Sequence, residues 1–155
     1  MRRPVTALLA LILAGVWTYA AENPQVGTWK MNVAKSKYSP GPAPKSGTVK
    51  IEAWGDDGVK VTADGVNADG QATHVEFQAK YDGKDYPITG LPNADTILLK
   101  RVNPNTVDGI TKKGGKQAGK TRSIVSKDGK TRTFTSEGTD AQGRKFKNVT
   151  LYDRE

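Results

Sequence analysis

The amino-acid sequence predicts an all-β protein, an up-and-down antiparallel barrel of about ten strands. Apolar and polar side chains alternate along its segments, for example over residues 75–81, which is typical of half-buried antiparallel strands. Turn-forming pairs such as Asp82-Gly83 and Gly114-Gly115 recur between these segments, and such pairs favour the positive φ angles of tight hairpins. We prefer a closed barrel to a sandwich because closure leaves no exposed strand edge.

The first residues predict a secretion signal. Arg2 and Arg3 form a basic start, residues 7–16 form a short apolar run, and small residues precede a cut after Ala20. The apolar run is too short to cross a bilayer, and no second run follows it. We therefore expect a signal peptide over residues 1–20, no transmembrane segment, and an exported protein that is periplasmic or secreted.

The remaining residues, 21–155, predict a single barrel domain whose first strand carries Gly-Thr-Trp-Lys at residues 27–30. A proline-rich loop follows over residues 32–46, where three prolines exclude a long helix and leave room for one short turn. The expected strands span residues 26–31, 47–54, 58–66, 72–81, 84–89, 95–102, 105–112, 117–126, 130–138 and 144–153.

The Asp82-Gly83 pair predicts a tight hairpin in which both central residues take left-handed angles. In the expected register Tyr81 faces Lys84, Lys80 faces Asp85, and Ala79 faces Tyr86. This register places Phe77 on the inner face of the barrel and forms an ion pair between Lys80 and Asp85 on the outer face.

Two short motifs are similar to ligand-binding loops, and we interpret both as hairpin turns. Residues 114–121 satisfy the phosphate-loop pattern Gly-x4-Gly-Lys-Ser/Thr, but that mechanism needs a helix after the loop and the residues that follow are β-rich. Residues 67–76 approach a calcium loop, but Gly65 stands where the first acidic ligand is required.

Side chains that commonly carry out catalysis are few. The chain has no cysteine and one histidine, His74, which strand alternation places on the polar face beside Glu76 and Lys80. No serine lies in a nucleophile elbow. We therefore expect no enzymatic activity, no metal site and no cofactor.

The Gly-Thr-Trp-Lys segment, the ten-strand layout and the length together resemble the calycin superfamily, and within it the lipocalins and fatty-acid-binding proteins. The resemblance implies a lipocalin-like barrel around a small apolar molecule, with Trp29 under a basic side chain from the end of the last strand, here Arg154. The proline-rich loop replaces the two-helix lid of fatty-acid-binding proteins, and Thr150 replaces the arginine of their last-strand Arg-x-Tyr motif. The layout also resembles small exported bacterial proteins of unknown role, which implies a compartment and no activity.

Alternation turns a set of aromatic side chains toward the interior, where they fill a core or line a cavity for one small ligand. These residues are Phe77, Tyr81, Phe134 and Tyr152. Arg132 shares the parity of Phe134, and an inward arginine would select an acidic ligand through paired hydrogen bonds. From these five residues we expect a non-enzymatic barrel that binds a small, mostly apolar molecule, hydrophobic or acidic.

The formal charge of +8 lies in the C-terminal third of the chain. Residues 100–155 carry fourteen Lys/Arg against six Asp/Glu, whereas residues 1–99 carry ten of each. Such a bias attracts polyanions, although the solvated outer faces of strands carry the same residue types. The alternative function is an envelope-associated module that binds polyanions or anionic surfaces, without specific recognition of nucleic acid.

Overall fold

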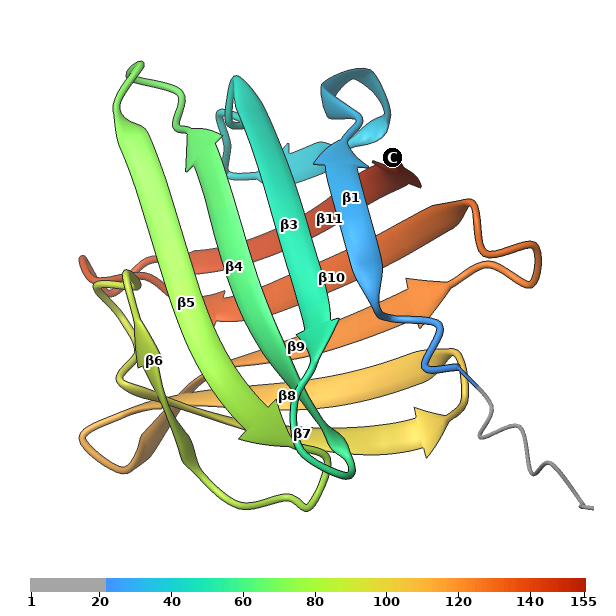
Figure 1. Cartoon of the computed structure of the whole chain (residues 1–155). Helices are drawn as coiled ribbons and strands as arrows, with labels where there is room; N and C mark the ends of the chain where they lie inside the picture. Colours follow the sequence, from blue (N-terminus) through green and yellow to red (C-terminus); the bar gives the residue numbers. More distant parts are fainter. Residues whose placement is uncertain (1–21) are drawn as a thin grey trace, which may run out of the picture.

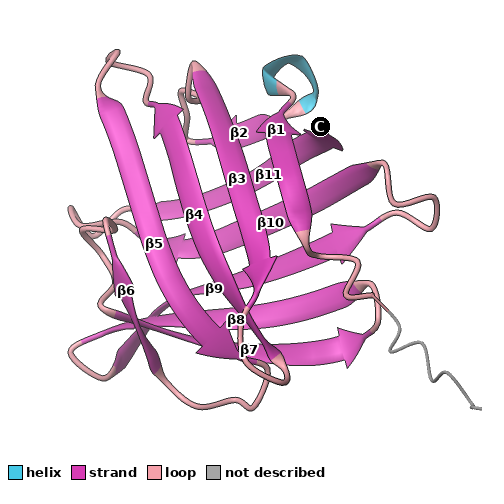
Figure 2. Ribbon diagram, in the orientation of Figure 1, coloured by secondary structure: helices cyan, strands magenta, loops and turns pink. Residues whose placement is uncertain are grey.

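The structure is a computed structural model that describes residues 22–155, so the predicted signal peptide over residues 1–20 lies outside the described residues. The described part contains strands and a single short 3-10 helix (Figure 2). The elements are β1 (Gly27–Met31), η1 (Val33–Lys35), β2 (Lys37–Ser39), β3 (Ser46–Ala53), β4 (Gly58–Val66), β5 (Ala72–Lys80), β6 (Tyr86–Thr89), β7 (Thr96–Asn103), β8 (Thr106–Lys113), β9 (Lys116–Val125), β10 (Thr131–Thr139) and β11 (Lys145–Arg154).

Ten of these strands close into the up-and-down antiparallel barrel that the sequence predicts. Each strand from β3 to β11 pairs with the next along the chain, and β1 pairs with both β3 and β11, which closes the sheet. Figure 1 shows the layer of β1, β3, β4 and β5 crossing the layer of β7 to β11 behind it. The predicted fold class is confirmed, because the alternating segments occupy successive strands with their apolar faces turned inward.

The proline-rich segment contains the expected short turn and also a strand that the sequence analysis did not predict. Asn32 caps η1 by accepting a hydrogen bond from the backbone N of Lys35 at 3.2 Å. The chain then forms β2, which pairs with residues 147–149 of β11 beyond the point where β1 pairs with the same strand. β1 and β2 therefore pair one after the other with the same side of β11, and η1 separates them.

Both motifs that approach ligand-binding loops form hairpin turns, as interpreted. Gly114 and Gly115 form the tip between β8 and β9 with φ angles of 54° and 78°, and the residues after them form β9 rather than a helix. The segment between β4 and β5 closes through Asn67, whose backbone N donates to the carbonyl oxygen of Gln71 at 2.9 Å.

The prediction of a tight turn at Asp82-Gly83 is wrong, although the predicted register is correct where β5 and β6 pair. Phe77 lies opposite Ile88 as predicted, but positive φ angles occur only at glycines among the described residues. Asp82 thus lacks the left-handed angle that this turn requires. The backbone N of Gly83 instead donates to the carbonyl oxygen of Leu99 on β7 at 3.0 Å.

Side chains around this connection have different partners from those expected. The predicted Lys80–Asp85 ion pair is absent from the described ion pairs, and Asp85 pairs with Lys112 of β8 at 2.9 Å. Lys80 is exposed, and Phe77 is half-buried against the core. The predicted faces of β5 are therefore correct, while the connection to β6 bends toward β7.

One end of the barrel is closed around Trp29, which is fully buried with 0% of its surface exposed. Its indole Nε1 donates to the carbonyl oxygen of Gln25 at 3.0 Å. The guanidinium of Arg154 lies 4.1 Å from the centre of the Trp29 ring and donates to the carbonyl oxygens of Val26 and Pro24 at 2.8 and 2.9 Å. The end of the last strand therefore fastens the segment before β1 across the barrel floor.

Trp29→Ala should lower the free energy of unfolding by about 3–5 kcal/mol, because it leaves a large cavity and removes the ring beneath Arg154. Urea unfolding followed by circular dichroism measures the change. Trp54→Ala is the control, since Trp54 is only half-buried and should cost clearly less. An equal loss in both variants would show that Trp29 has no special part in closing the barrel.

Candidate ligand-binding cavity

The interior of the barrel contains a cavity of about 610 Å³ between the two layers of strands. This volume lies within the usual range for pockets that hold a small organic molecule. All five residues predicted as ligand contacts line it, namely Phe77, Tyr81, Arg132, Phe134 and Tyr152. Strand alternation places them there, because each lies on the inner face of β5, β10 or β11 or directly after β5.

Arg132 is the charged group in the deep part of this cavity and is only 6% exposed. Its Nε donates to Oγ of Ser123 on β9 at 2.7 Å, and that hydroxyl donates to Oε1 of Gln25 at 2.7 Å. Nε2 of Gln25 donates to the carbonyl oxygen of Asn105 at 3.0 Å. This chain of neutral groups holds the guanidinium through its Nε atom. It makes no hydrogen bond with either terminal nitrogen of the guanidinium.

The charge of Arg132 has no acidic partner among residues 22–155. Its Nη1 is buried without a hydrogen-bond partner in this part of the chain, and the guanidinium lies 5.0 Å from the Phe134 ring centre and 5.2 Å from that of Tyr152. Burial lowers the pKa of the Arg132 guanidinium, and burial also raises the pKa of the Tyr152 hydroxyl. A buried cation held only by neutral groups and ring faces attracts an anion from outside the protein.

Residues of three loops line the cavity at the opposite end of β10 from Arg132. These residues lie at 40–42, 91–93, 140–142 and 144, and several of them are exposed. Nδ2 of Asn93 donates to the carbonyl oxygen of Thr139 at 3.0 Å and so links one of the loops to the end of β10. This end is therefore the mouth through which a ligand would enter, while Arg132 lies near the closed floor.

Two residues that hold Arg132 in place were not predicted from the sequence. Ser123 has the same parity as the buried Val125 on β9, so alternation could have placed it inside. Gln25 is 3% exposed but precedes the first strand, where no periodic pattern applies. Its position follows only from the contacts that Arg154 and Trp29 make with the same segment.

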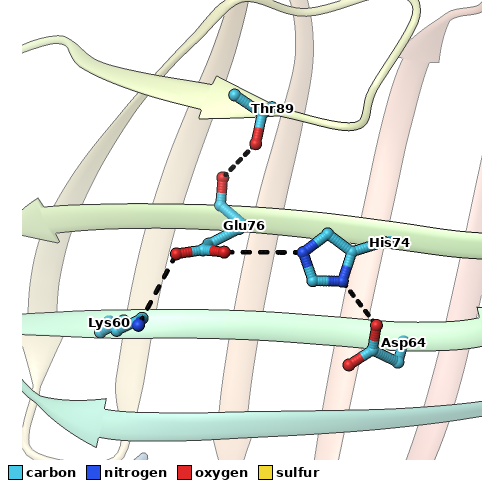
Figure 3. A network of polar contacts seen from close by, with 5 residues as sticks. All are labelled: Lys60, Asp64, His74, Glu76 and Thr89. Atoms are coloured by element: carbon cyan, nitrogen blue, oxygen red, sulfur yellow. Dashed lines mark hydrogen bonds and ion pairs between the residues drawn. The ribbon is translucent and has the colours of Figure 1, made fainter.

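The single histidine lies on the outside of the barrel, away from the cavity. Figure 3 shows His74 between Asp64 and Glu76, with Nε2 of His74 3.5 Å from Glu76 and Nδ1 in contact with Asp64. The hydrogen bond that His74 donates to Asp64, together with the negative charge of Asp64, raises the pKa of His74. Residues 22–155 contain no group of three or more acidic, histidine or cysteine side chains that could hold a metal ion.

Helix in the described residues is confined to η1, which has neither the length nor the apolar character that a bilayer span requires.

Comparisons with known proteins find solved structures with a similar fold. No family model and no curated protein sequence matches the chain. The crystal structure of the wild-type fluorescent protein UnaG is 17% identical with a TM-score of 0.53, over 84% of this chain and 97% of that chain. Two single-residue variants of UnaG give TM-scores of 0.52 and 0.53 at 17% and 20% identity, over 85% and 84% of this chain and 96% and 95% of theirs. The predicted calycin-like β-barrel fold is confirmed.

Arg132→Met should raise the free energy of unfolding of the ligand-free protein by about 1–3 kcal/mol. The substitution removes a buried, unpaired charge and keeps the hydrogen bond between Ser123 and Gln25. Urea unfolding measures the effect, and Arg122→Met is the control because it removes the same charge from an exposed pair with Asp108. A loss of stability in Arg132→Met would contradict the view that this charge is uncompensated.

Proposed function

We propose that the protein is an exported, non-enzymatic barrel that binds a small, mostly apolar molecule with an acidic group. The observation that carries this proposal is Arg132, a buried cation inside a hollow barrel whose Nη1 has no hydrogen-bond partner among residues 22–155. A carboxylate or another monoanion would supply the missing partner and would be stabilised by the low dielectric of its surroundings.

The rest of the lining supports a ligand with an apolar body. Valine, isoleucine, leucine and phenylalanine side chains from β3 to β7 face the cavity, so a bound hydrocarbon surface would be removed from water. The proposal is for a binder rather than an enzyme, because hydroxyl groups, an amide and aromatic rings surround Arg132 rather than an activated nucleophile or an acid–base pair.

The alternative, a basic surface that binds polyanions, receives less support from the arrangement of charges. Several cations of residues 100–155 lie in ion pairs with acidic side chains, and Arg132 lies inside the barrel. The paired cations are Arg101, Lys112, Arg122, Arg144 and Lys147. Such pairs reduce the positive field that a polyanion would meet.

Export is part of the proposal and rests on the sequence of residues 1–20. The protein recovered from the envelope or medium of its host should lack these residues, so that its first residue is Ala21. Intact-mass spectrometry measures the N-terminus directly. Recovery of the full-length chain from the cytoplasm alone would remove export from the proposal and leave the cavity argument unchanged.

The charge preference of the cavity can be tested with two apolar dyes, anilinonaphthalene sulfonate and its neutral counterpart phenylnaphthylamine. Arg132→Met should weaken binding of the sulfonate by about 10- to 100-fold, the value of a charge-assisted hydrogen bond, and should spare the neutral dye. Fluorescence titration measures both affinities, with Arg122→Met as the control for loss of charge on the outer surface. Equal affinity of the wild type and Arg132→Met for the sulfonate would refute the proposed role of Arg132.

A further inference from the structure

The cavity has two chemically different walls. The wall formed by β3 to β7 presents aliphatic and aromatic side chains, with the hydroxyl of Tyr81 just after β5 as its polar atom. These side chains are Val49, Ile51, Val59, Val61, Ala63, Val75, Phe77, Ile88, Ile97 and Leu99. The wall formed by β8 to β11 adds hydroxyl and amide side chains to its apolar ones, in addition to Arg132. A ligand in this cavity therefore meets most of the hydrogen-bonding groups on one side.

Three of these polar side chains lie in a row across neighbouring strands. Thr121 of β9 is directly opposite Ser136 of β10, and Ser136 is directly opposite Asn148 of β11. Residues directly opposite each other in antiparallel strands project from the same face of the sheet, and all three line the cavity. We call Thr121, Ser136 and Asn148 the polar row.

A glycine continues the polar row onto β8 and leaves space for its first hydroxyl. Gly109 lies directly opposite Thr121, and a Cβ atom at Gly109 would collide with Oγ1 of Thr121. The Thr121 hydroxyl therefore occupies space that any larger residue at position 109 would take. The same relation holds between Gly119 of β9 and Thr111 of β8, where a Cβ would come within 2.9 Å of the hydroxyl oxygen.

The polar row lies between Arg132 and the mouth. Ser136 follows Arg132 by four residues on β10, which is ~13 Å along the strand. The mouth loops begin beyond it, at residue 140 on this side of the cavity. When the acidic group of a ligand reaches Arg132, the middle or far part of the ligand must therefore lie beside the polar row.

We propose that the polar row is a second subsite, which receives a hydroxyl, carbonyl or amide group that the ligand carries roughly 10–13 Å from its acidic group. This inference rests on the proposed function, because Arg132 fixes the orientation of the ligand. A plain hydrocarbon chain would exclude water from the polar row without replacing the lost hydrogen bonds, and such a loss weakens binding. The natural ligand is therefore an acid with a hydrogen-bonding group on one side and an apolar surface on the other.

Oleate and ricinoleate test this inference, because ricinoleate is the same unsaturated acid with one added hydroxyl near the middle of its chain. Isothermal titration calorimetry on the full barrel should give an affinity for ricinoleate about 5- to 10-fold higher than for oleate. The double variant Thr121→Val, Ser136→Ala should abolish this preference by weakening ricinoleate while leaving oleate unchanged or tighter. Thr135→Val is the matched control, since Thr135 lies on the opposite face of β10 from Ser136.

The outcomes separate this inference from the proposed function. Equal affinity for the two acids, or a preference that survives in the double variant, would overturn the polar row as a subsite while Arg132-dependent binding remained. Failure of both acids to bind, with the response of the sulfonate dye to Arg132→Met intact, would also overturn it. Loss of that dye response would remove the proposed function, and the inference with it.

Discussion

The contact between Arg154 and Trp29 is the interaction on which the rest of the barrel depends. It joins the end of the last strand to the first strand and fastens residues 24–26 across the floor. Gly27 permits this arrangement, because its φ of 144° and its missing side chain leave room for the guanidinium. The same segment supplies Gln25, which holds Ser123 and through it Arg132. The contacts that close the barrel therefore also orient the charged group in the cavity.

Arg132 illustrates how a binding site can conflict with folding. The hollow interior lacks the packing contacts that a filled core would provide. The buried guanidinium adds a desolvation cost that its neutral partners only partly offset. A scaffold with a continuous hydrogen-bonded sheet can carry both costs, since every strand is paired around the barrel. The cavity and the buried charge thus lower stability and also distinguish the interior from an ordinary apolar core.

Ten of the eleven strands, all except β2, could be predicted from the sequence because side-chain parity is a local property. Trp29, Phe77 and Arg132 all face inward as alternation predicts, and most hairpin tips contain a glycine. The connection after Asp82 could not be predicted, because it depends on a hydrogen bond to β7 rather than on the turn residues. The polar row was also beyond sequence reasoning, since it requires the register between β9, β10 and β11. Parity gives the face of each residue, and only pairing gives its neighbours across the sheet.

The interruption between β1 and β2 has a consequence for how this barrel can diversify. The two pieces pair with different parts of β11, and η1 bridges them without contributing to the ladder. Insertions or deletions at this point would change the chain length while leaving the hydrogen-bond stagger of the closed sheet intact. The segment leads directly into residues 40–42 at the mouth. Variation in loop length here could alter the entrance of the cavity, and hence ligand exchange, independently of the residues that line its interior.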